Sequence, residues 1–465
     1  MTASPALASP TCDVNASVTV RRGGAYSTTM HKPVTTLSAR RALVAGRERS
    51  RCYITIRNGL IDAVTQHKPQ GSEEVELGSL DLIPGVIDLH GDSLNSRRQP
   101  RTGTRFPLGP TLLQADTEGI SNGVTTQCLC VTVDEDLTKW GDIEDPLKWL
   151  HALQRQRQSL RTDSYLHVRF ELTTAVTTPH ADLFDNDYTR VVSYMVHAPG
   201  VGQYTHDPAA WHKLYLRSHP GPSEDRQRLA TERLARANDV TDARRRVADA
   251  ARAAGIALAS HDDITPADAV AAANVGASIA EFPLTMDAAT HAKSLGLGVI
   301  VGAPNAWQGR SHLAWLSART AVRAGVVDAL VSDYHPSSML QAAYALAQDE
   351  CASWAEALNL VTQGPARLAD FTDRGQIAEG LSADLAAVDM SAGTRSSTRP
   401  LSRSTRRSDE RPTMRIGLTA ARPRAAPLAS ASNATAGCPT GRPGCVRHSR
   451  LPVCGCAGPG IAGWR

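Results

Sequence analysis

The chain has 465 residues, of which 42% are hydrophobic, so it can build one large domain with a substantial core. No run of 18 or more apolar residues occurs, and the N-terminus lacks the basic start and apolar block of a secretory signal, which argues against membrane insertion and secretion. The nine cysteines form an odd, scattered set, which favours reduced thiols over a disulfide framework. We therefore expect a cytoplasmic protein.

The net charge of +4 is unevenly distributed along the chain. Residues 391–465 contain 13 Arg, no Lys and two acidic residues, a surplus of +11, so residues 1–390 carry a net charge of −7. The basic balance of the whole chain is thus no sign of nucleic-acid binding by its main part. We expect a small-molecule substrate, with neither nucleic acid nor a membrane as partner.

The N-terminal region falls into two parts. Residues 1–34 are rich in Ser, Thr and Ala without periodicity, which predicts a disordered extension. Residues 35–82 contain short strand-like stretches such as RCYITIRNGLIDAV, in which Asn58-Gly59 is a hairpin turn signal. We therefore expect a small N-terminal β unit.

From Ile83 onward, apolar strand-like runs alternate with helical segments rich in Ala, Arg and Glu. The eight expected strands are IPGVIDLH (83–90), VTTQCLCVTV (124–133), YLHVRFEL (165–172), VVSYMVH (191–197), IALASHDD (256–263), SIAEFP (278–283), GVIVGAPN (298–305) and DALVSDY (328–334). This alternation predicts the α/β class and a (β/α)₈ barrel over residues 83–370. A doubly wound sheet is the alternative, but no Gly-x-Gly-x-x-Gly follows any of the strands, which removes the usual dinucleotide-binding interpretation.

The C-terminal region changes composition abruptly. Residues 371–390 are expected to begin a return to the N-terminal β unit. Residues 391–465 are rich in Arg, Ser and Pro and cannot build a core, so we expect a disordered tail. A reading-frame shift in the source gene would also produce such a change.

The expected barrel strands end in polar residues. These are His90, Asp92, His167, Arg169, Glu171, His197, His261, Asp262, Asp263, Glu281, Asn305 and Asp333. In a (β/α)₈ barrel the carboxyl ends of the strands form one mouth, where catalytic side chains gather. Residues two apart on a strand point to the same side, so His90 and Asp92 can face one metal ion. Imidazole and carboxylate ligands suit a divalent ion such as Zn²⁺ or Mn²⁺.

Each of these residues also has a simpler interpretation. A single histidine at a strand end is more often a hydrogen-bonded core or surface group, and we place His206, His212 and His219 in that class. The coincidence of several His and Asp residues at strand ends favours a metal site.

The motifs DLHGD, SHDD, IAEFP, GAPN followed by GRSH, and SDYHPSSMLQAAYALA resemble the amidohydrolase superfamily. More narrowly, they are similar to its phosphonate-utilisation branch, the alpha-D-ribose 1-methylphosphonate 5-triphosphate diphosphatases of the carbon–phosphorus lyase pathway. The resemblance covers approximately residues 35–389. It implies a metal-dependent (β/α)₈ hydrolase that releases pyrophosphate from the ribose triphosphate and leaves the 5-phosphate. It also implies pathway partners and allows for a homo-oligomer.

The resemblance implies a set of metal ligands and catalytic groups. The ligands would be His90, Asp92, Glu171, His197, His261 and Asp333, holding one or two Zn²⁺, with Mn²⁺ or Fe²⁺ as alternatives. Glu171 would bridge two metals, or else form a salt bridge with Arg169. Catalysis would involve His261 and Asp333, with Asp333 accepting a proton from the attacking water.

Cations should line the mouth, because a triphosphate must be neutralised before it is attacked. The expected substrate-binding residues are Arg101, Arg169, Arg310, His312, Ser337 and Ser338. The two serines precede a helix whose free N–H groups suit a phosphate, although a plain N-cap explains them equally well. We regard Arg98 as a solvated loop charge.

Two other functions stay open. A metal-dependent amidohydrolase acting on C–N bonds, such as a cyclic amidase or an N-acyl amino-acid deacylase, would share the barrel and ligands. An inactive truncated or frameshifted copy is the third interpretation. The chain also departs from the branch at Asn95-Ser96-Arg97, where a Glu-Lys-His-like segment is usual, so any substrate contact made there is in question.

Overall fold

The computed structural model describes residues 34–101, 103–174, 179–214, 223–310 and 315–389. The expected disordered extension, residues 1–34, lies outside these ranges except for its last residue, and the expected tail, residues 391–465, lies outside them entirely. Within the described ranges, no helix is both long and apolar enough to cross a membrane.

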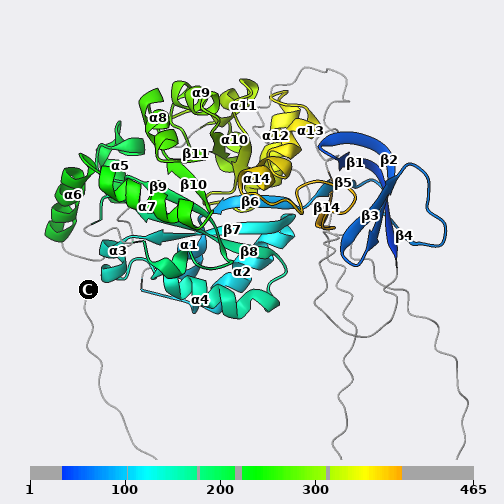
Figure 1. Ribbon diagram of the computed structural model, residues 1–465, viewed down its shortest axis with the longest axis horizontal. Helices are drawn as coiled ribbons and strands as arrows, with labels where there is room; N and C mark the ends of the chain where they lie inside the picture. The colour runs from blue at the N-terminus through cyan, green and yellow to red at the C-terminus, as the bar shows by residue number, and fades with distance from the viewer. Residues whose placement is uncertain (1–33, 102, 175–178, 215–222, 311–314, 390–465) are drawn as a thin grey trace, which may run out of the picture. The chain divides into compact units, whose positions relative to one another are not determined.

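Eight parallel strands form the barrel (Figure 1). In chain order they are β6 (Val86–Gly91), β7 (Val124–Val133), β8 (Asp163–Glu171), β9 (Thr189–Met195), β10 (Ala257–His261), β11 (Ile279–Glu281), β12 (Gly298–Gly302) and β13 (Ala329–Val331). The ring closes where the Asp92 N–H donates to the Asp333 carbonyl at 2.7 Å and the Asp333 N–H donates to the His90 carbonyl at 2.8 Å. The predicted (β/α)₈ barrel is confirmed, and the doubly wound alternative is wrong.

Helices surround the barrel and cover the outer face of its strands (Figure 1). They are α1 (Leu94–Arg98), α2 (Leu108–Ser121), α3 (Glu135–Trp140), α4 (Pro146–Gln156), α5 (Pro208–Leu214), α6 (Ser223–Ala237), α7 (Thr241–Ala253), α8 (Pro266–Asn274), α9 (Met286–Ser294), α10 (Ala303–Gln308), α11 (Ala318–Arg323), α12 (Ser338–Gln348), α13 (Trp354–Asn359) and α14 (Gln363–Leu368). Every residue of β7 except Thr132 is buried. A strand covered on both faces is a continuous apolar run, which explains why these strands were visible in the sequence.

A second sheet flanks the barrel. It contains β1 (Thr35–Val44), β2 (Arg47–Arg57), β3 (Leu60–Thr65), β4 (Glu73–Glu76), β5 (Asp81–Pro84) and β14 (Leu385–Val388), in the order β14-β5-β1-β2-β3, with β4 paired to β1. The expected hairpin joins β2 to β3, where Asn58 has φ +55° and Gly59 has φ +77°. Two consecutive positive φ values define the type I′ turn that an Asn-Gly pair favours.

Gly85 separates β5 of the flanking sheet from β6 of the barrel. A Cβ atom at this position would lie 2.1 Å from Thr125 Oγ1, so only glycine fits so close to β7. Its N–H donates to the Asp384 carbonyl at 2.7 Å, which brings the chain entering β14 next to the start of the barrel. The first strand that carries candidate ligands is therefore anchored at its beginning by tight backbone contacts.

Arg374 bridges elements at the opposite end of the barrel from the candidate ligands. Its guanidinium donates to Thr126 Oγ1 at 2.8 Å, to Asp163 Oδ2 at 2.6 Å and to Asp373 Oδ1 at 2.9 Å. Thr126 lies near the start of β7 and Asp163 begins β8. This ion-pair cluster around the buried Arg374 guanidinium joins the amino ends of two barrel strands to the segment that leads into β14.

Candidate metal centre at the mouth of the barrel

The six expected ligands lie at the carboxyl ends of the barrel strands. His90, Glu171 and His261 lie at the ends of β6, β8 and β10, and the others follow β6, β9 and β13 within two residues. The ring centroids of His90 and His261 are 6.1 Å apart, and those of His197 and His261 are 5.6 Å apart. The structure thus gathers these side chains in one place, as barrel geometry predicts.

One compact group in the mouth is His197, His261 and Asp262. One ligand atom from each lies within 4.8 Å of the others. Asp262 Oδ2 is 3.2 Å from His261 Nδ1 and 3.6 Å from His197 Nε2. Asp262 was absent from the expected ligand set, although the SHDD motif contains it. Its φ of +61° turns the backbone just after β10 and brings its carboxylate toward both imidazoles.

These residues fit a metal ion in their chemistry and in their unmet polar contacts. His261 Nδ1 and Asp262 Oδ2 are buried atoms that make no hydrogen bond within the described part of the chain. These two atoms lie 3.2 Å from each other, and buried polar atoms without hydrogen bonds are costly unless an ion or water completes them. Burial disfavours a charged His197, but its contacts with Asp262 and Glu171 outweigh burial and raise its pKa to about 9. A metal ion would replace that proton.

Glu171 directs its carboxylate at His197. Its Oε2 lies 3.2 Å from His197 Nδ1, and both oxygens accept from the His197 backbone N–H at 3.2 Å. Oε1 also accepts from the Thr173 N–H at 3.0 Å. These contacts occupy both oxygens and favour a role in orienting His197. The bridging role expected for Glu171 stays a prediction that the contacts do not favour.

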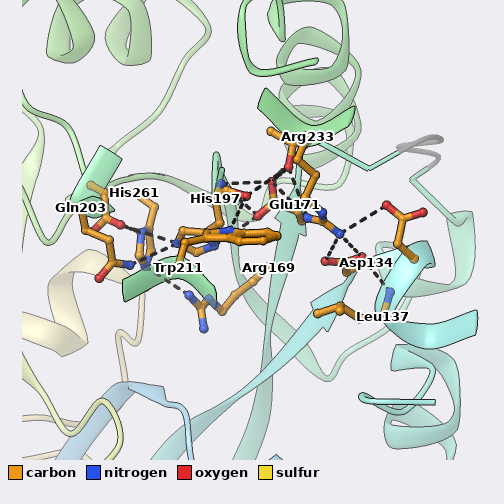
Figure 2. A network of polar contacts seen from close by, with 12 residues as sticks. Asp134, Leu137, Arg169, Glu171, His197, Gln203, Trp211, Arg233 and His261 are labelled. Carbon is orange, nitrogen blue, oxygen red and sulfur yellow. Dashed lines mark hydrogen bonds and ion pairs between the residues drawn. The ribbon is translucent and has the colours of Figure 1, made fainter. Parts of the chain in front are cut away.

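A buried arginine, Arg233, lies beside Glu171 (Figure 2). Arg233 of α6, with a side chain that is 0% exposed, donates to both Asp134 oxygens at 2.7 and 2.8 Å and to Thr173 Oγ1 at 3.2 Å. It also lies 3.9 Å from Glu171 Oε1. The Trp211 indole donates to the His197 carbonyl at 3.1 Å. His197 is thus fixed at its ring and at its backbone, as a metal ligand should be.

Arg169 pairs with Asp92 rather than with Glu171. Its Nη1 donates to Asp92 Oδ2 at 2.6 Å, and its Nη2 donates to His261 Nε2 at 3.3 Å. The expected Arg169–Glu171 salt bridge is therefore wrong, because the two side chains turn toward different strands. Burial opposes ionisation of Asp92, but the Arg169 guanidinium holds the pKa of that carboxyl below its usual range. Substrate binding by Arg169 stays a prediction.

Glu281 joins the site although it was not among the expected ligands. It ends β11, is 1% exposed, and places Oε1 2.7 Å from His90 Nδ1. The next residue, Phe282, has φ +53° and packs its ring against His90 and His261, at centroid distances of 5.0 and 5.3 Å. The IAEFP motif contains the signal for both, but the residue types alone do not reveal which histidine they contact.

Asp333 follows β13 and has φ +54°. Burial raises the pKa of Asp333 to about 7, and the nearby Asp92 carboxylate adds to the shift while Arg169 opposes it. A carboxyl group with a pKa near neutrality can both accept and release a proton at the pH of the cell. This property suits the proton-transfer role expected for Asp333.

For the remaining substrate-binding candidates, the structure gives no contact with the six expected ligands among the described residues. Arg101 and Arg310 are exposed, and His312 lies outside the described residues. Ser337 Oγ lies 3.0 Å from His335 Nδ1, and the Ser338 hydroxyl donates to the His335 carbonyl at 2.7 Å. Neither hydroxyl caps α12, so the plain N-cap interpretation is wrong, and the phosphate-binding role stays a prediction.

Comparison with solved structures shows which proteins share this fold. N-isopropylammelide isopropylaminohydrolase from Burkholderia multivorans ATCC 17616 superposes with a TM-score of 0.52 and 17% identity, over 78% of this chain and 94% of that one. An uncharacterized metal-dependent hydrolase from Pyrococcus furiosus gives 0.52 and 12%, over 77% and 99%. At these identities the likeness concerns the fold alone. Residues 229–411 match the amidohydrolase family.

Similarity to a relative in sequence shows the family to which the chain belongs. The chain is 33% identical over 339 residues to the alpha-D-ribose 1-methylphosphonate 5-triphosphate diphosphatase of Escherichia coli (strain K12), an alignment that covers 71% of this chain and 89% of the relative. The chain therefore belongs to the amidohydrolase family, in the branch that this diphosphatase represents.

Proposed function

We propose that the protein hydrolyses alpha-D-ribose 1-methylphosphonate 5-triphosphate to the 5-phosphate and pyrophosphate. The observation that carries this proposal is the 33% identity to the Escherichia coli diphosphatase across 89% of that enzyme's length. The buried polar centre at the barrel mouth supplies the chemistry that such a reaction needs. We further propose that it acts in the cytoplasm, in phosphonate catabolism with the other proteins of the carbon–phosphorus lyase system.

The reaction must overcome the negative charge of the substrate. Water adds to the α-phosphorus while the bond to the bridging oxygen breaks, and pyrophosphate leaves with its negative charge. A bound divalent ion, which we expect to be Zn²⁺, would supply Lewis acidity and lower the pKa of water. His197, His261 and Asp262 would hold it, with His90 and Asp333 beside them.

The chain's own residues would then manage protons and charge. Asp333, with a pKa near 7, would take the proton from the attacking water and return it to the solvent or the leaving group. Arg169 is almost fully buried and shared between Asp92 and His261, so it brings a fixed positive charge to the place where phosphate charge accumulates. Arg101 and Arg310 would contribute weaker attraction from the rim.

A coupled assay of pyrophosphate tests the proposal. Purified full-length protein, supplied with Zn²⁺ or Mn²⁺, is incubated with the ribose triphosphate and, separately, with a panel of cyclic amides and N-acyl amino acids. Stoichiometric pyrophosphate from the triphosphate supports the proposal. Turnover of amides without pyrophosphate release would replace it with the C–N hydrolase alternative.

The inactive-copy interpretation needs its own measurement. Metal analysis of the same preparation, together with the assay after metal addition, decides it. Bound divalent metal with turnover excludes an inactive copy. Less than one equivalent of metal, with no turnover on any substrate, would support one.

A further inference from the structure

Three side chains from three neighbouring barrel strands form a second group beside the centre. His90 lies on β6, Cys130 on β7 and His167 on β8, all buried, with one ligand atom of each within 4.8 Å of the others. Cys130 and His167 are partners in the register of β7 and β8, so the strand pairing itself holds them side by side. The sequence QCLCV resembled an ordinary apolar strand and gave no sign of this group.

The hydrogen bonds of His167 fix its tautomer. Nδ1 lies 2.9 Å from the Leu89 carbonyl, which can only accept, so Nδ1 carries the proton. Nε2 is then left to accept a hydrogen bond, and it faces the Ser193 hydroxyl at 2.9 Å. A histidine that donates its other N–H to a backbone carbonyl is oriented as metal-ligating histidines are.

Glu281 supplies an independent observation. Its Oε1 lies 2.7 Å from His90 Nδ1, whereas Oε2 is buried and makes no hydrogen bond within the described part of the chain. Oε2 lies 3.9 Å from His167 Nε2 and also 3.9 Å from His261 Nε2. This carboxylate therefore stands between the two groups, with one oxygen left for a cation.

We propose that His90, Cys130 and His167 form a second metal position, with Glu281 shared between it and the group of His197, His261 and Asp262. Thiolate and imidazole ligands suit Zn²⁺ or another borderline to soft divalent ion, and disfavour Mg²⁺ and Ca²⁺. Glu281, rather than Glu171, then occupies the place between the two metals. Binding would displace the Cys130 proton and turn the Ser193 hydroxyl away from His167.

Cobalt provides the test, because Co²⁺ bound to thiolate absorbs in the near ultraviolet and Co²⁺ bound to nitrogen and oxygen alone does not. Metal-free full-length protein is titrated with Co²⁺, followed by absorption and by equilibrium dialysis. Serine replaces Cys438, Cys445, Cys454 and Cys456 in every protein compared, because those thiols could also bind Co²⁺. No substrate is needed, so the outcome is separate from that of the diphosphatase assay.

The matched comparison is Cys130→Ser against Cys128→Ser. Cys128 lies two residues earlier on the same strand and is equally buried, but it is outside the group. We expect about two Co²⁺ per chain and a near-ultraviolet band in the parent and in Cys128→Ser, and about one Co²⁺ without the band in Cys130→Ser.

Circular dichroism verifies that each variant is folded. For the parent protein, zinc X-ray absorption should also show a Zn–S distance of about 2.3 Å, which needs no substitution at Cys130. Absence of the band and of the Zn–S distance in the parent would overturn the proposal. Retention of the band in Cys130→Ser, or its equal loss in both variants, would also overturn it.

Discussion

The two ends of the barrel differ in how their buried polar groups are hydrogen-bonded. At the amino end, the Arg374 guanidinium donates to Thr126, Asp163 and Asp373. At the carboxyl end, His261 Nδ1 and the second oxygens of Asp262 and Glu281 are buried without hydrogen bonds among the described residues. We expect the ion pairs at the amino end to stabilise the fold, and the polar atoms at the carboxyl end to be available to bind an ion.

The backbone shows the same contrast. Asp262, Phe282 and Asp333 follow three barrel strands at the mouth, and each has a positive φ, of +61°, +53° and +54° respectively. A non-glycine residue in this region costs about 1–3 kcal/mol, and such residues cluster at functional sites. Strain and unmet polar contacts coincide at the mouth, so we expect substitutions there to affect activity and substitutions at the amino end to affect stability.

The largest effect should follow Asp333→Asn. Asparagine keeps the shape and tolerates the left-handed backbone, but it cannot take a proton. We expect kcat for pyrophosphate release to fall by about 10²–10⁴-fold, while the denaturation midpoint stays close to that of the parent. Asp370→Asn is the control, because Asp370 also has a positive φ, of +53°, and is exposed. Equal kcat values for Asp333→Asn and the parent would show that another group moves the proton.

The substitution Arg374→Met should lower stability and leave activity unchanged. Arg374 is buried while Asp163 and Asp373 are 24% and 45% exposed, so the carboxylates left behind stay partly solvated, and we expect a loss of about 1–3 kcal/mol in the free energy of unfolding, measured with urea. Activity per folded molecule should stay unchanged. The control is Arg367→Met, since Arg367 is 69% exposed in its pair with Asp328 and should change stability by about 1 kcal/mol or less. If Arg374→Met lowered kcat with no change in stability, the contrast between the ends would fail.

The sequence predicted the fold well, because strands buried on both faces are continuous apolar runs bounded by polar ends. It also indicated which end carries the chemistry. It did not indicate which side chains meet, because that depends on the register between strands. Glu171 is paired with Met195 of β9, so it reaches His197 two residues further on, whereas Arg169 turns to Asp92.

The sequence also did not predict the backbone turns that follow the strands. Both Asp262 and Asp263 follow His261, and residue type cannot distinguish them. The positive φ of Asp262 brings its carboxylate to the two histidines, while Asp263 Oδ2 accepts from the Ser260 hydroxyl at 2.6 Å. Glu281 and Cys130 were not predicted as site residues for a different reason, because the residues that they contact lie on other strands.

Glu171→Gln should have an intermediate effect. The amide cannot provide the negative charge that orients the His197 ring, so we expect metal affinity to fall by about 10–100-fold. Competition with a chromophoric chelator measures this without any substrate. Glu232→Gln is the control, because Glu232 is 43% exposed on α6 in its pair with Arg236. Unchanged affinity in Glu171→Gln would mean that the carboxylate serves packing alone.

The smallest effect should follow Arg310→Ala. An exposed cation at the rim contributes about 1 kcal/mol or less, so KM for the triphosphate should rise by about fivefold at most, with kcat unchanged. The effect should shrink at high salt, because the interaction is screened. Arg245→Ala on α7 provides a control for a general change in charge. A loss of kcat instead would place Arg310 among the reacting groups.

The measurement that tests the central claim most directly is pyrophosphate release by the purified, metal-loaded protein from alpha-D-ribose 1-methylphosphonate 5-triphosphate. We predict one pyrophosphate per molecule of alpha-D-ribose 1-methylphosphonate 5-phosphate formed, loss of turnover on chelation, and recovery when Zn²⁺ or Mn²⁺ is restored. Turnover that persists after complete metal removal, or cleavage of amides but not of the triphosphate, would contradict the account.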